Sequence, residues 1–191
     1  MRTLLRAPGK PFHPPLTDAS IGAYTAGVAM LVLGALGVEE EQMAHGALLA
    51  ISLGLILAAP TALTGLLDWL DIPRGTPARS VATIHLWVMV AATVLFALTW
   101  LAQLDGYRND EVRGLALGLG VAAFALLALG GNIGGANVFV YGIRVLKAED
   151  TPPREALNPL GVGEEKVPPG MPEQSAGAYP EERPGGQRPP R

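Results

Sequence analysis

Four long segments without any Lys, Arg, Asp or Glu constrain this chain more than any other feature. They cover residues 19–38, 43–67, 81–104 and 114–143, and they are 20, 25, 24 and 30 residues long. A helix rises about 1.5 Å per residue and the bilayer hydrocarbon is about 30 Å thick, so roughly 20 apolar residues span it. Helices of a water-soluble bundle carry a charged face, which these segments lack. The sequence therefore predicts an all-α fold, an antiparallel four-helix transmembrane bundle.

Basic residues are unevenly distributed around these segments. Arg108 and Arg113 are expected on one side of the membrane, together with six acidic residues. Seven other basic residues are expected on the opposite side. Because Lys and Arg are in excess in cytoplasmic loops, we expect both termini to be cytoplasmic. The seven residues expected on the cytoplasmic side are Arg2, Arg6, Lys10, Arg74, Arg79, Arg144 and Lys147.

The chain divides into three regions. Residues 1–18 form a polar cytoplasmic lead-in, and residues 19–147 form the transmembrane domain. The fourth segment would be about 45 Å long as one helix, so we expect the span to cover 114–134, to bend or stop near its glycines, and to continue as an interfacial segment to residue 147. Residues 148–191 hold ten of the 17 prolines and 13 of the 31 charged residues, which predicts a disordered cytoplasmic tail.

The composition excludes several kinds of function. The chain contains no cysteine, which rules out disulfides, thiolate zinc sites and iron–sulfur clusters held by its own thiolates. A net charge of −3 argues against a partner nucleic acid. Sequence patterns of phosphate-binding loops, serine hydrolases and zinc proteases are absent, so we expect no independent catalytic activity. Histidine and carboxylate side chains remain as the main strong ligands.

Four sequence motifs occur in one order along the membrane part. They are HPPLTDASIG at residues 13–22, PTALTGLLDW at 60–69, an R-x5-H from Arg79 to His85, and GGNIGG at 130–135. This set resembles a bacterial membrane family catalogued as domain of unknown function 2231, and the likeness covers about residues 12–146. The resemblance implies a four-helix integral protein of the bacterial cytoplasmic membrane. Some members of the family are joined to Rieske-type or cytochrome-type electron-transfer domains, which implies a membrane redox partner.

The predicted topology brings the polar motif residues to one end of the bundle. Ionisable groups at such a place are costly unless they are paired, hydrated or ligating, so their convergence raises the hypothesis of a functional site. We identify His13 and His85 as candidate haem or metal ligands. Pro14 favours an extended backbone at His13, just before the first helix. The candidate supporting residues are Asp18, Asp68, Arg79 and Asn132.

Three chemistries fit these residue types. Two histidines could ligate the iron of haem b, two histidines with a carboxylate could hold a divalent metal, and the carboxylates with His85 could relay protons beside a quinone. The competing structural interpretation is that Thr17 or Asp18 caps the first helix, Asp68 pairs with Arg79, and both histidines bond to the backbone. His45, at the opposite end, is expected to be an interfacial residue.

Three functions follow from these alternatives. The first is a membrane redox or cofactor-binding module. The second is a non-enzymatic structural or assembly subunit, in which Gly-x-x-x-Gly spacings allow close helix packing or a homo-oligomer in the lipid bilayer. The third is a small channel or transporter. The glycine pairs with this spacing are Gly114 and Gly118, Gly130 and Gly134, and Gly131 and Gly135.

Overall fold

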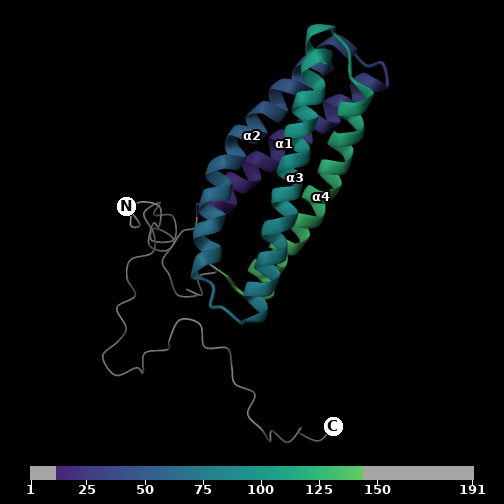
Figure 1. Cartoon of the computed structure of the whole chain (residues 1–191). Helices are drawn as coiled ribbons and strands as arrows, with labels where there is room; N and C mark the ends of the chain where they lie inside the picture. The colour runs from purple at the N-terminus through teal and green to yellow at the C-terminus, as the bar shows by residue number, and fades with distance from the viewer. Residues whose placement is uncertain (1–11, 144–191) are drawn as a thin grey trace, which may run out of the picture.

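A computed structural model of the chain describes residues 12–143 as a bundle of antiparallel helices, which confirms the predicted fold class (Figure 1). The helices are α1 (His13–Ala35), α2 (Glu40–Asp71), α3 (Pro77–Arg108) and α4 (Gly114–Phe139). All four are long and apolar enough to cross a membrane. The predicted tail, the first 11 residues of the lead-in and the part of the interfacial segment from residue 144 onward lie outside the described residues.

The bundle is built from two helical hairpins. α1 packs along α2, and α3 packs along α4, more extensively than the hairpins contact each other. Glycines allow the close approach within a hairpin: a Cβ atom at Gly54 of α2 would lie 2.5 Å from Cδ1 of Tyr24. The Tyr24 ring stacks in turn on Phe96 of α3, with 3.8 Å between the ring centroids. Small residues serve helix packing in this way inside a bilayer, where burying apolar surface gives no advantage over lipid contact.

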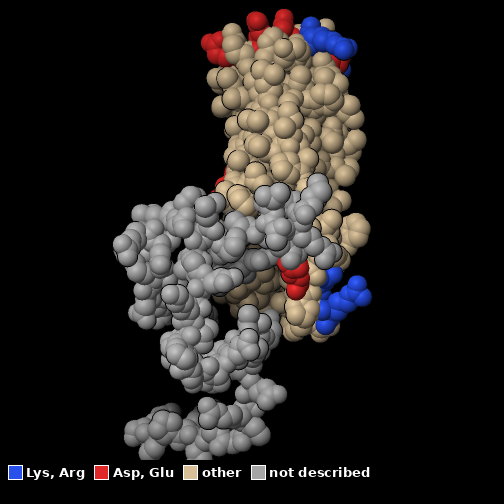
Figure 2. Space-filling model, turned by 90° about the vertical axis from the view of Figure 1, so that its left-hand side faces the viewer, with Lys and Arg blue, Asp and Glu red and all other residues tan. Residues whose placement is uncertain are grey.

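Charged side chains gather at the two ends of the bundle, and an uncharged belt separates them (Figure 2). Large apolar side chains such as Leu49, Ile56 and Val94 are exposed on this belt. A water-soluble helix would place its polar residues there. The surface therefore agrees with a bundle that has lipid around its middle.

The first helix begins earlier than the charge pattern predicts. His13 is its first residue, and Pro14 and Pro15 occupy its first turn. Proline is favoured at this position because the first amide groups of a helix have no acceptor within it. The expectation of an extended backbone at His13 was therefore wrong. Since the helix begins ahead of Thr17, this residue is not its cap, and its hydroxyl donates instead to the main-chain oxygen of His13 at 2.8 Å.

The fourth helix runs without interruption through residues 130–135 to Phe139, so it does not stop near these glycines as one of the two expected alternatives had it. Glycine weakens a helix in water by about 1 kcal/mol. Within lipid, however, a break would leave backbone groups without hydrogen-bond partners, which costs more. Packing also supports this stretch, because Gly130 lies against Met89 and Gly134 lies against His85 of α3.

Candidate functional site

A cavity of about 510 Å³ lies between the two hairpins, in the half of the bundle where α1 and α3 begin. We call it the histidine cavity. All four helices contribute to its wall, which is mostly apolar. The wall also carries polar and titratable side chains, among them His13, Asp18, Tyr24, Asp68, His85 and Asn137.

His13 enters the cavity wall from the first turn of α1. Its Nδ1 lies 3.0 Å from the main-chain oxygen of Thr61 in α2. A carbonyl oxygen can only accept, so Nδ1 carries a proton and donates it. The ring lies on Gly65, where a Cβ atom would come within 2.7 Å of Cε1. Nε2 is 3.5 Å from the Thr17 hydroxyl, whose proton is already directed to the main chain, so Nε2 of a neutral ring keeps its lone pair.

His85 is held in the same manner by the other hairpin. Its Nδ1 lies 2.9 Å from the main-chain oxygen of Gly130 in α4. The ring rests on Gly134, where a Cβ atom would lie 2.8 Å from Cε1. In both hairpins the accepting carbonyl belongs to the residue four positions before the glycine that supports the ring. The part of the chain that the structure describes offers no hydrogen-bond partner to Nε2 of His85.

This arrangement determines what the two imidazoles can do. A neutral histidine that donates from Nδ1 to a carbonyl has its ring orientation fixed and its Nε2 lone pair available. Metal-ligating histidines commonly have this second hydrogen bond. The structure therefore brings two such rings, one from each hairpin, to the wall of one cavity. Both histidines bond to the backbone, as the competing structural interpretation expected, yet this bonding is compatible with a ligand role.

The predicted supporting residues divide into two groups. Asp18 and Asp68 line the cavity. Arg79 does not line it: its guanidinium lies 3.4 Å from the ring centroid of Trp69 and donates to the main-chain oxygens of Trp69 and Ile72, so it caps the end of α2. Asn132 is exposed and is absent from the cavity wall. The structure therefore does not bring Arg79 and Asn132 to the histidines.

Several polar residues of the wall are not among the predicted site residues, and two of them matter for the chemistry of the cavity. Asn137 and Tyr24 both line the cavity and are buried. Helical periodicity could have identified Asn137, because it follows Gly130 by seven residues, about two turns, and so shares the inward face that Asn132 does not. Tyr24 lies deep inside an apolar span and follows no motif, so the sequence alone does not connect it with the histidines.

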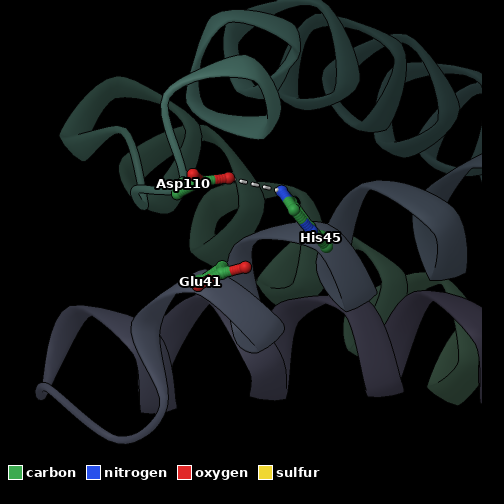
Figure 3. Close-up of side chains that lie close together, drawn as sticks. All are labelled: Glu41, His45 and Asp110. Carbon is green, nitrogen blue, oxygen red and sulfur yellow. Dashed lines mark ion pairs between the residues drawn. The ribbon is translucent and has the colours of Figure 1, made fainter.

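The third histidine, His45, lies near the start of α2, at the opposite end of the bundle, and Figure 3 shows it facing Asp110. Its Nε2 is 2.9 Å from Oδ1 of Asp110 and 2.9 Å from the main-chain oxygen of Tyr107. Among residues 12–143, one group of three side chains could hold a metal ion, with ligand atoms within 4.8 Å of one another. Its members are Glu41, His45 and Asp110. Because both contacts of His45 are acceptors, Nε2 donates here. His45 thus fastens the α3–α4 connection to α2.

The four apolar helices define the chain as a multi-pass membrane protein. Residues 9–147 match the family described as predicted membrane protein DUF2231, and the chain belongs to this family. No curated protein and no solved structure matches the chain.

Proposed function

We propose that this protein is a cofactor-binding module of the bacterial cytoplasmic membrane, with both termini cytoplasmic. His13 and His85 hold a redox cofactor in the histidine cavity. The observation that supports this proposal is the shared hydrogen bonding of the two rings, each of which donates from Nδ1 to a main-chain oxygen. Two oriented imidazoles in a largely apolar wall are costly to maintain unless a ligand uses them.

The two Nε2 lone pairs suit three kinds of cofactor. They can coordinate haem iron, coordinate a divalent transition metal, or accept a hydrogen bond from a reduced quinone. In each case the bond from Nδ1 to the main chain orients the ring before the cofactor binds. A membrane redox partner would exchange electrons with this cofactor.

The proposal is tested on protein purified in mild detergent from the native membrane. We expect a haem absorption band, a bound metal or an extractable quinone in near-stoichiometric amount. His13→Ala and His85→Ala should each lower the bound cofactor about tenfold or more, because each removes a direct partner. His45→Ala is the matched control and should keep the cofactor. Wild-type protein that carries none of the three cofactors would refute the proposal.

The outer face of α4 supports a second candidate, a non-enzymatic subunit that associates with a second copy or a larger complex. Gly114 and Asn132 are 18 residues apart, five helical turns, so they share one face with Gly118 and Ala125 between them. All four are exposed, and Asn132 has no side-chain hydrogen bond within the described range 12–143. Small residues and amides favour helix association in lipid.

Cross-linking tests this second candidate, because a chain without native cysteine can form a disulfide only between copies when one cysteine is added. If α4 pairs with its own copy, Ala125→Cys should give disulfide-linked dimers in native membranes. Adding Asn132→Leu should lower the yield several-fold, since one interhelical hydrogen bond contributes about 1 kcal/mol. Leu53→Cys, on the exposed face of α2, is the control. Equal yields from the two cysteine positions would contradict a specific α4 interface.

A further inference from the structure

Two buried polar atoms in the wall of the histidine cavity lack a hydrogen-bond partner among residues 12–143. They are the hydroxyl of Tyr24 and Oδ1 of Asn137, and the two residues are only 2% and 9% exposed. Tyr24 cannot easily turn away, because its ring is stacked on Phe96 and pressed against Gly54. Buried polar atoms normally have partners, so a molecule in the cavity would supply what the protein leaves open.

The free polar atoms differ in kind between the two ends of the cavity. At the histidine end they include two acceptors, Nε2 of His13 and Nε2 of His85, beside the amide group of Asn137, whose Oδ1 accepts. Tyr24, whose hydroxyl can donate, follows His13 by 11 residues, so their Cα atoms are about 16 Å apart along α1, and the two side chains take up part of this separation. The complementary ligand is therefore elongated. It accepts a hydrogen bond at the edge that faces Tyr24 and donates one at the edge that faces the histidines. A quinone ring has oxygens on opposite edges, and its reduced form carries hydroxyl groups that donate.

The cavity is also not fully enclosed, and we infer that it opens toward the lipid side of the bundle. Leu66 of α2 and Val90 and Val94 of α3 line it, yet they are 40%, 44% and 53% exposed. The wall between these two helices is thus incomplete in the apolar belt. An isoprenoid tail could leave the cavity there and remain in the bilayer without crossing a polar surface.

A bare metal ion and haem each satisfy fewer of these observations than a quinone does. The one group of three metal-type ligands in the described part of the chain lies at the other end of the bundle, so a bare ion in the cavity would lack a third close protein ligand. Haem would leave the Tyr24 hydroxyl unpaired, because its hydrogen-bonding groups are two charged propionates, which are too costly to place at the apolar end of the cavity beside Tyr24. Building on the function proposed above, we propose that the cofactor is an isoprenoid quinone whose ring lies between Tyr24 and the histidines.

Tyr24→Phe is the decisive variant, because it keeps the stacked ring and removes only the hydroxyl. Decylubiquinone and a short-chain menaquinone are titrated into the full-length protein in nanodiscs, and quenching of tryptophan fluorescence reports binding beside Trp69 of the cavity wall. We expect the Kd of the variant to rise about three- to tenfold, as loss of one hydrogen bond predicts. The ligand-free variant should unfold at an equal or higher temperature, since an unpaired buried hydroxyl has been removed. Tyr107→Phe, at the opposite end, is the control and should leave the Kd unchanged.

The outcomes separate this inference from the broader proposal. Unchanged quinone binding in Tyr24→Phe would overturn the assignment of Tyr24. Purified protein that carries haem or a metal and does not bind either quinone would overturn the quinone inference while supporting cofactor binding. Protein that binds no cofactor at all would overturn both.

Discussion

Gly134→Ala is expected to lower the affinity for the bound cofactor about 10- to 100-fold, the usual effect of disturbing the partner that orients a ligating histidine. A Cβ atom at this position would lie 2.8 Å from Cε1 and 3.1 Å from Nδ1 of His85. The ring must therefore move away from the Gly130 oxygen, and Nε2 moves with it. Gly65→Ala should act on His13 in the same way, because its Cβ atom would lie 2.7 Å from Cε1 of that ring.

Gly22→Ala is the matched control for both variants. It is an exposed glycine of α1 with no heavy atom within 4 Å of an added Cβ atom, so alanine should strengthen the helix by up to about 1 kcal/mol and leave the cofactor bound. Cofactor content and Kd are the primary measurements. The ¹⁵N chemical shift of His85 Nδ1 reports the loss of its hydrogen bond even in ligand-free protein. Wild-type affinity together with a wild-type shift in Gly134→Ala would show that this glycine does not position His85.

The fold could be predicted from the charge pattern because the bilayer leaves few alternatives. A long segment without charge must be a helix in lipid, where every backbone group needs an internal partner. The same argument explains why the helix ends were less accurate. α1 extends outward through Asp18 and Thr17 to His13, beyond the charge-free segment, because nothing in the physics of a helix requires it to end at the first charge.

Only those parts of the site that consist of distinctive side chains could be predicted from the sequence. His13 and His85 stand out because the membrane segments contain few polar residues. Bonding of both histidines to the backbone was one of the expected alternatives, but the particular acceptors, the main-chain oxygens of Thr61 and Gly130, cannot be identified from side chains. Gly134 resembles a helix-packing residue and does pack closely, but against a histidine ring rather than another backbone.

Gln103→Leu is expected to destabilise the bundle by about 1–3 kcal/mol, because two main-chain groups would each lose a partly buried hydrogen bond. Gln103 is fully buried near the end of α3. Its Nε2 donates to the main-chain oxygen of Glu111 at 3.0 Å, and its Oε1 accepts from the amide of Arg113 at 3.1 Å. Gly106 leaves room for this amide, since a Cβ atom there would lie 2.7 Å from Nε2.

Leucine is close to glutamine in size, so the loss reports the two hydrogen bonds rather than an altered volume. Thermal or SDS unfolding of the purified protein measures it, and the exposed Gln42→Leu at the same end of the bundle is the control. Gln103 lies at the end of the bundle opposite the histidine cavity, so the folded variant should keep its cofactor. A loss no larger than that of Gln42→Leu would mean that water replaces both bonds, and that the α3–α4 connection depends instead on the ion pair of His45 with Asp110.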